Sequence, residues 1–395
     1  MTLHGLAARR VATCDPALGT VENGAVVLDG ARVVYVGPQA GAPPEATLVD
    51  VGDRIITPGL VDVHTHACWA GSRHNEYAVR MAGGDYRDIA SAGGGILSTH
   101  RAVAAATEDE LFGALRARLG RMVSLGVTTV EVKSGYGLEP EHEHKQLAAI
   151  ARAAAEPDGP SVVATFLALH ALPPSAERVS YVARIAREVV PAVARERLAT
   201  FVDAYVDANA FTVAEARTVG SAARAAGLGV RLHVGQFADV GGAELAAELG
   251  AASVDHVEHV SPAGIAALAR AGVSAVLLPV ASFTLAQAPP PVRQLRAAGI
   301  RLVVASDANP GTAPTESLPL ALALAVRSYG LTPDEALWAA TRDAAASLGL
   351  PDRGVLRAGA RADLVVWDLP HEHALVQPWG VPRTHAVLVG GQRVR

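Results

Sequence analysis

Two histidines separated by one residue end a short apolar run near the start of the chain. The stretch reads Asp-Val-His-Thr-His at positions 62–66. Positions i and i+2 of a β-strand point to the same face, so His64 and His66 can approach one metal ion together. A pair of ordinary surface histidines would give the same pattern, so the hypothesis needs support from elsewhere in the chain.

Two further His-x-His pairs show how weak this pattern is on its own. His142 and His144 lie in a predicted helix, where side chains two positions apart diverge by about 200°, so we expect them to be exposed. His371 and His373 flank Glu372 ahead of the last β-rich segment. Few polar groups follow that could complete a site, so we predict a solvent loop there.

Three more polar residues follow apolar runs of the same kind, namely His233, His256 and Asp307. A single histidine at a strand end is more often a core group than a ligand. Four histidines and one aspartate at the ends of four strands, however, predict a metal site. Imidazole and carboxylate ligands suit Zn²⁺, with iron as the second choice.

The predicted chemistry is the activation of water. A catalytic metal ion keeps one position for water and lowers its pKa from about 15.7 to about 7. Asp307 and His256 are candidates to hold and move the proton of that water. A nucleophilic serine or cysteine is less favoured, because Gly-x-Ser-x-Gly is absent and Cys68 has no evident base.

Alternating apolar runs and Ala-rich helical stretches would position these residues. Helix-forming stretches such as 108–125, 141–155 and 176–195 separate most of eight apolar runs. This alternation indicates a parallel sheet, and eight units favour a closed (β/α)8 TIM-type barrel with its active site at the C-terminal ends of the strands. The candidate strands are 59–63, 128–132, 162–169, 199–206, 230–233, 252–256, 275–278 and 302–306.

Both ends of the chain read as β structure. Residues 24–37 hold two apolar runs around Asp29-Gly30, which is a hairpin signal, and residues 363–367 and 386–389 are short β-rich runs. We therefore predict an α/β protein in three segments. Residues 1–57 and 353–395 would form one small β-sandwich domain, and residues 58–352 the barrel.

Composition limits the partners. The 395 residues are 50% hydrophobic and carry a net charge of −5, so no basic excess indicates nucleic acid or a membrane surface. The longest charge-free run, 271–292, includes a triple proline and reads as a strand and loop rather than a membrane span. Cys14 and Cys68 lack a paired spacing and no export signal is evident, so we expect a cytoplasmic protein without disulfides.

Longer motifs surround the candidate ligands. The first metal motif is Pro-Gly-Leu-Val-Asp-Val-His-Thr-His at 58–66, and narrower motifs are Lys-Ser-Gly-Tyr-Gly-Leu at 133–138 and Ser-Asp-Ala-Asn-Pro-Gly-Thr at 306–312. Shorter matching segments are 71–73, 93–99, 131–132 and 170–174. Together, over nearly the whole chain, these segments resemble the amidohydrolase superfamily and, within it, the imidazolonepropionase family.

The resemblance implies one metal ion and a surrounding substrate shell. The implied metal ligands are His64, His66, His233 and Asp307, with His256 close to the metal-bound water. The implied substrate-binding residues are Arg73, Tyr86, Tyr136, His170, Gln236, Asn309, Gly311 and Thr312. The residues expected to act in catalysis are His256, Asp307, His170 and Gln236.

The implied reaction is hydrolysis of 4-imidazolone-5-propanoate to N-formimidoyl-L-glutamate in histidine degradation, by metal-activated water attacking the cyclic amide carbonyl. The substrate carries a carboxylate, which the guanidinium of Arg73 would fit. Tyr136 would hydrogen-bond the propionate or the ring, and His170 would polarise the ring carbonyl. The loop at 309–312 would offer backbone donors and a hydroxyl.

Gln236 departs from related amidohydrolases, which carry glutamate at this position. Glutamine cannot act as a general acid or base, so His256 or Asp307 must move the proton, and Gln236 would hydrogen-bond a ring nitrogen. This speaks against a nucleobase-type deaminase, in which a carboxyl group protonates the ring. The alternatives remain another mononuclear amidohydrolase, such as a nucleobase-type deaminase or another cyclic amidase, and an inactive barrel acting as a binding subunit.

The lysines bear on the number of metal ions. Lys133 and Lys145 are the only two in the chain, and two-metal cyclic amidases usually carry a bridging carboxylated lysine. Lys133 follows the second strand without an evident metal partner, so one divalent or trivalent ion, zinc or iron, is favoured. The expected partner is a small anionic substrate, with neither nucleic acid nor membrane, and the expected assembly is a homodimer.

Overall fold

The computed structural model describes residues 3–83, 94–377 and 379–395. Its larger unit is a barrel of eight parallel strands that neighbour one another in chain order. The ring closes between the last and first strands, where Thr65 bridges Ala308 and the Asp307 N–H donates to the His64 carbonyl at 3.0 Å. The predicted barrel is confirmed. Its strands are β6 (Leu60–Asp62), β7 (Val127–Lys133), β8 (Ser161–Leu169), β9 (Phe201–Val206), β10 (Gly229–Val234), β11 (Ser253–His256), β12 (Ser274–Leu277) and β13 (Leu302–Val304).

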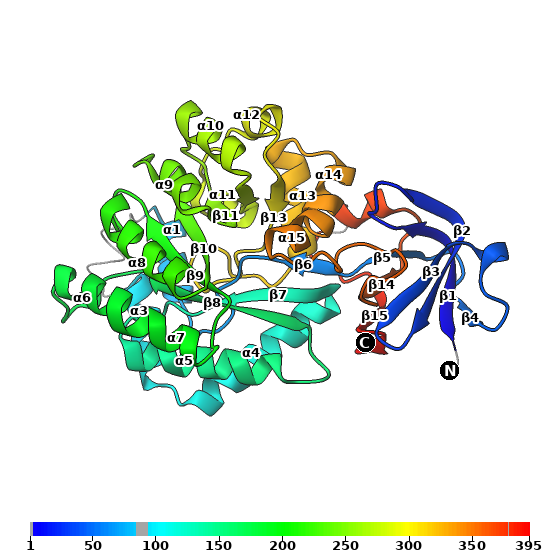
Figure 1. Ribbon diagram of the computed structural model, residues 1–395, viewed down its shortest axis with the longest axis horizontal. Helices are drawn as coiled ribbons and strands as arrows, with labels where there is room; N and C mark the ends of the chain where they lie inside the picture. Colours follow the sequence, from blue (N-terminus) through cyan, green and yellow to red (C-terminus); the bar gives the residue numbers. More distant parts are fainter. Residues whose placement is uncertain (1–2, 84–93, 378) are drawn as a thin grey trace.

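Helices cover the outside of this barrel (Figure 1). Local sequence fixes where several begin, since Thr107 and Thr212 each form a capping box with the glutamate three residues later. The helices that follow the first four barrel strands are α1 (His74–Met81), α3 (Ile96–Ala105), α4 (Glu108–Ser124), α5 (Pro140–Ala154), α6 (Arg178–Arg184), α7 (Val190–Arg195) and α8 (Val213–Ala225). Those after the later strands are α9 (Gly242–Leu249), α10 (Pro262–Ala271), α11 (Pro279–Leu285), α12 (Val292–Ala297), α13 (Leu318–Tyr329), α14 (Pro333–Ala339) and α15 (Arg342–Ser347).

The predicted single helix at 176–195 is divided. A π-helical turn, Ile185–Val189, separates α6 from α7, and Pro191 lies in the first turn of α7. Proline has no backbone N–H to continue the α-helical hydrogen-bond ladder, so the ladder changes register just before it.

The second unit is one mixed sheet made by both ends of the chain, drawn in blue and red at one side of Figure 1. The hairpin predicted around Asp29-Gly30 is confirmed by β2 and β3. The two ends meet where β14 pairs antiparallel with β5, with Val366 opposite Ile56. Its strands are β1 (His4–Ala12), β2 (Thr20–Asp29), β3 (Arg32–Pro38), β4 (Thr47–Asp50), β5 (Ile55–Pro58), β14 (Leu364–Trp367), β15 (Thr384–Val389) and β16 (Gln392–Arg393).

Trp367 and two glycines join this sheet to the N-terminal ends of the barrel strands. The Trp367 indole N–H donates to Thr57 Oγ1 at 2.9 Å, and the ring packs where Gly126 has no side chain. Gly59 links β5 to β6, and a Cβ there would lie 2.0 Å from Thr128 Oγ1. The sheet therefore lies at the barrel end opposite the predicted active site.

Within the described ranges, no helix has the length and apolar character needed to cross a membrane.

Candidate metal centre and active site

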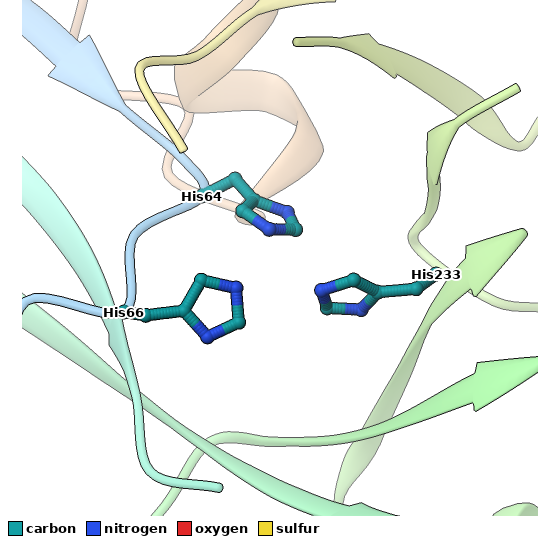
Figure 2. Close-up of side chains that lie close together, drawn as sticks. All are labelled: His64, His66 and His233. Carbon is teal, nitrogen blue, oxygen red and sulfur yellow. The ribbon is translucent and has the colours of Figure 1, made fainter. Parts of the chain in front are cut away.

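Three imidazoles converge inside the barrel at the C-terminal ends of its strands. His64 and His66 follow β6, and His233 lies near the end of β10. One ring nitrogen of each lies within 4.8 Å of the others (Figure 2). All three side chains are buried. The two histidines whose spacing first suggested a site therefore share it with a third from across the barrel.

Asp307 reaches the same cluster from the loop after β13. Its Oδ1 lies 3.4 Å from His64 Nε2 and 3.5 Å from His66 Nε2. The backbone of Asp307 has a φ of 55°, a left-handed conformation that is uncommon for a residue with a side chain. The structure thus brings together all four residues expected to hold the metal ion.

The donor set fits a metal ion. Among the described residues, His64 Nε2 and His233 Nε2 are buried without a hydrogen-bond partner. Burial, together with nearby positive groups, lowers the pKa of His64 and His66 well below the ordinary value, so both imidazoles are neutral, as metal ligands must be. Three imidazoles and one carboxylate form a set suited to zinc or iron.

Two aspartates orient the rings of His64 and His233 through their Nδ1 atoms. Asp255 Oδ2 lies 2.6 Å from His64 Nδ1, and Asp203 Oδ1 lies 3.1 Å from His233 Nδ1. A carboxylate at Nδ1 fixes the proton there and leaves Nε2 free for the metal. Sequence reasoning missed both aspartates. A charged residue inside an otherwise apolar strand was the available signal.

Lys133 lies among three buried carboxylates beneath the cluster. Its ammonium is 2.8 Å from Glu131, 2.9 Å from Asp203 and 3.7 Å from Asp255, and none of these side chains is exposed. Burial lowers the pKa of Lys133, but the carboxylates outweigh that effect and raise it above the ordinary value. Lys133 is therefore an ammonium ion that neutralises the aspartates behind the histidines.

His256 lies beside the cluster, with its ring centroid 5.6 Å from that of His233. Burial alone would lower its pKa, but the carboxylate of Glu258, 3.7 Å from Nδ1, raises it above the ordinary value. Sequence reasoning did not find Glu258, two residues after the strand end.

Arg73 lies against Gly311, which belongs to the loop after β13. Its guanidinium is held by Glu76, 2.7 Å away, and both side chains are nearly buried. A Cβ on Gly311 would lie 2.2 Å from Arg73 Nη1, so the glycine leaves room for the guanidinium. Glu76 was not anticipated, although its position three residues after Arg73 is a common spacing for ion pairs on helices.

Tyr136 and His170 lie against the cluster. The His170 ring stacks on His66 with centroids 5.4 Å apart, and the Tyr136 ring lies 5.2 Å from His170. His170 Nδ1 is 2.7 Å from the Gly135 carbonyl, which can only accept, and burial lowers the pKa of His170 to about 3. Neutral His170 therefore carries its proton on Nδ1 and offers Nε2 as an acceptor. The expectation that His170 polarises a ring carbonyl does not fit this tautomer.

The backbone N–H groups of Gly311 and Thr312, in the loop after β13, form hydrogen bonds within that loop. The N–H groups of Gly311 and Thr312 both donate to Asn309 Oδ1 at 2.8 Å, and Asn309 Nδ2 donates to the Asp307 carbonyl at 2.7 Å. The expectation of backbone donors for substrate from this loop is therefore wrong, because these N–H groups already bond the Asn309 side chain, which in turn holds the Asp307 carbonyl. Tyr86 lies outside the described residues.

Gln236 follows His233 and is buried. The Tyr205 hydroxyl donates to Gln236 Oε1 at 2.8 Å. This bond orients the side-chain amide so that Nε2 is its remaining donor. Tyr205 was not anticipated, since nothing in the sequence places it beside Gln236.

The competing candidates behave as ordinary structural groups. Burial raises the pKa of the Cys68 thiol to about 12, so it is not a nucleophile at neutral pH. Residues 371–373 form a second group whose ligand atoms lie within 4.8 Å, but Glu372 is buried and bound by Arg10 at 2.6 Å. The predicted solvent loop is wrong for Glu372, because this ion pair ties it to the terminal sheet.

Comparison with known proteins agrees with the fold. Residues 55–394 match the amidohydrolase family. Among solved structures, a zinc-bound adenosine deaminase from Xanthomonas campestris superposes with a TM-score of 0.74 at 20% identity, covering 99% of this chain and 92% of that one. A triazine hydrolase from Arthrobacter aurescens gives 0.75 at 17%, covering 100% and 94%. At these identities, the likeness concerns the fold alone. The chain belongs to the amidohydrolase family.

Sequence relatives place it more narrowly. An imidazolonepropionase of Caulobacter vibrioides is 46% identical over 386 residues, covering 95% of this chain and 96% of the relative. One from Methylobacterium nodulans is 45% identical over 395 residues, covering 98% of each. Within the amidohydrolases, the chain falls among the imidazolonepropionases.

Proposed function

We propose that this chain hydrolyses 4-imidazolone-5-propanoate to N-formimidoyl-L-glutamate, a step of histidine degradation, with one metal ion, zinc or iron, held by four residues. The observation that carries the proposal is the buried cluster of His64, His66, His233 and Asp307 in a chain about 45% identical to imidazolonepropionases over nearly its whole length. The charged state of Lys133 supports a single ion, since an ammonium paired with three carboxylates is not available for carboxylation.

A bound metal ion supplies Lewis acidity at the cyclic amide carbonyl and lowers the pKa of a coordinated water. The protein's own groups must bind and orient the substrate. The guanidinium of Arg73, held by Glu76, pairs with the propionate carboxylate. The Tyr136 hydroxyl, whose pKa is raised by burial, stays protonated as a donor.

Two side chains contact the ring of the substrate. Gln236 donates from Nε2 to a ring carbonyl or nitrogen acceptor, and His170 accepts a ring N–H at Nε2. These two complementary contacts fix the ring plane relative to the cluster.

Hydrolysis adds water across the C–N bond, with oxygen joining the carbonyl carbon and hydrogen joining the ring nitrogen that leaves. A side chain must carry that proton, and an amide such as Gln236 cannot. Among the residues beside the cluster, His256 and Asp307 have the required acid–base chemistry. We assign the transfer to His256 Nε2, because Asp307 is engaged as a ligand.

The test is turnover of imidazolone propionate by the purified, metal-loaded protein, followed as loss of its ultraviolet absorbance. We expect turnover with zinc or iron and none after chelation. If the loaded protein leaves this substrate intact but deaminates an aminated ring, the proposal fails in favour of a deaminase. If it turns over neither substrate while holding its metal, an inactive binding barrel is the better description.

Three further points belong to the proposal. We propose a small anionic substrate as the physiological partner, a homodimer as the assembly and the cytoplasm as the compartment. The reducing cytoplasm suits Cys14 and Cys68, which are buried free thiols. Light scattering of the purified protein should give twice the mass of one chain.

A further inference from the structure

A chain of four buried polar side chains runs outward from the active site. It begins at His256 at the end of β11, passes to Glu258 in the loop that follows, then to Ser282 in α11, and ends at Tyr329 in α13. The Ser282 hydroxyl donates to Glu258 Oε1 at 2.8 Å, and the Tyr329 hydroxyl donates to Ser282 Oγ at 2.6 Å. All four residues are at most 9% exposed.

Two atoms in this chain complement each other. Among the described residues, His256 Nδ1 and Glu258 Oε2 are both buried and without a hydrogen-bond partner. They lie 3.7 Å apart, about 0.8 Å beyond the ~2.9 Å of a charge-assisted hydrogen bond. A small side-chain rotation closes that gap, and leaving both atoms unpaired away from water is unfavourable.

The backbone turns sharply to bring them together. His256 has a φ of 83° and Val257 a φ of 63°, so two consecutive residues with side chains are left-handed at the end of β11. Such conformations are costly and cluster at functional sites. Here the turn brings the Glu258 carboxylate to within 3.7 Å of His256 Nδ1.

Among the described residues, three other imidazoles of the site show this arrangement, whereas His66 Nδ1 is buried without a hydrogen-bond partner. Asp255 holds His64 at Nδ1, Asp203 holds His233 at Nδ1, and the Gly135 carbonyl holds His170 at Nδ1. In each case, the outer nitrogen is paired and Nε2 is left for the reaction centre. Glu258 is the group that stands in this position for His256.

We propose that Glu258 is a positioning residue that accepts the Nδ1–H of His256. It holds the ring in the tautomer whose Nε2 carries the lone pair, and Ser282 and Tyr329 hold Glu258. This rests on the proposed function, in which His256 Nε2 takes a proton from the attacking water and returns it to the leaving ring nitrogen. Because Gln236 cannot take that proton, the proton transfer depends on the orientation of His256.

The test compares zinc-loaded wild type with Glu258→Gln, which keeps shape but loses charge and preference for the Nδ1 proton. We expect kcat to fall about 10- to 100-fold, as for other residues that orient a metal-site histidine. KM should change less than twofold, and bound zinc should be unchanged. Tyr329→Phe, at the far end of the chain, should give a smaller loss in kcat. Glu372→Gln, which alters a buried carboxylate in the terminal sheet, is the matched control and should leave kcat unchanged.

A spectroscopic measurement separates this inference from the proposed function. Long-range ¹H–¹⁵N spectra should show His256 of the wild type protonated at Nδ1, and a mixture of tautomers in Glu258→Gln. Identical His256 spectra and kcat values within twofold would overturn the proposal. If wild type fails to hydrolyse imidazolone propionate, the proposed function falls, and the spectra alone decide the role of Glu258.

Discussion

Replacing Lys133 with methionine tests the charge balance beneath the metal centre. Methionine has a similar length but no charge, so Glu131 and Asp203 would face each other in a fully buried space. Removing one partner of a buried ion pair costs about 3–5 kcal/mol. For 395 residues, an unfolding entropy of about 2.1 cal/mol/K per residue gives ~0.8 kcal/mol/K, so the melting temperature should fall by about 4–6 °C.

Metal affinity should fall as well. Asp203 contacts both Lys133 and His233, so loss of the ammonium disturbs a group that orients a ligand. Outer residues of this kind typically contribute 10- to 100-fold to metal affinity. Calorimetry of the metal-free protein measures the first effect, and zinc competition with a chelator measures the second.

The chain provides its own control in its other lysine. Lys145 donates to the carbonyls of Ala104 and Ala106, away from any carboxylate in the cluster. Lys145→Met should reduce stability without changing zinc affinity. Adding Glu131→Gln to Lys133→Met should restore part of the lost stability, because one uncompensated charge is removed. If Lys133→Met melts within 1 °C of wild type and binds zinc equally well, the reasoning about buried charge is refuted.

Three other substitutions test separate parts of the site. Asp307→Asn should reduce turnover at least about 10³-fold, a rise of ~4 kcal/mol in activation free energy, because it weakens a candidate metal ligand. Full activity at normal metal content would contradict this role. Arg73→Met should raise KM about 10- to 100-fold in initial-rate assays, with a smaller effect on kcat, because the contact with the substrate carboxylate is lost. An unchanged KM would show that Arg73 does not bind this carboxylate. Burial raises the pKa of Glu143 to about 7, although the N–H groups of Gly135 and Leu138 bond its carboxylate. The folded chain therefore favours protonated Glu143, whose contribution to stability is full below about pH 4.5 and is lost as the pH rises through about 7. Glu143→Gln should flatten this decline in melting profiles, and parallel profiles for variant and wild type would count against it.

The sequence predicted the barrel and the meeting of the candidate ligands because both depend on local order. Each apolar run is long enough to identify a strand, and a strand's C-terminal end identifies the residue that enters the site. Position alone therefore predicted that His64, His66, His233, His256 and Asp307 meet, and the family resemblance selected four of them as candidate ligands. The terminal domain was predictable for a similar reason, since β-rich runs at both ends need partners.

The groups behind the ligands could not be found in this way. Asp255 lies opposite His233 in the ladder between β10 and β11, and that register depends on the whole barrel. Ser282 and Tyr329 lie 47 positions apart and meet because α11 packs on α13. The tautomer of His170 depends on a carbonyl 35 positions away. These features follow from tertiary packing, which residue spacing does not encode.

The pairing of the two chain ends has a consequence for synthesis and folding. Trp367 bonds Thr57 across 310 positions, so β5 waits for its neighbour β14 until almost the entire chain has left the ribosome. Closing so long a loop costs conformational entropy, and few local contacts form at the same time to offset it. We therefore expect the pairing of β5 with β14 to be slower than assembly of the barrel. Until then the inner edge of the N-terminal strands is open to pairing with other chains. Pairing of β14 with β5 therefore closes the terminal sheet late in synthesis. We expect the nascent polypeptide to aggregate most readily just before β14 emerges.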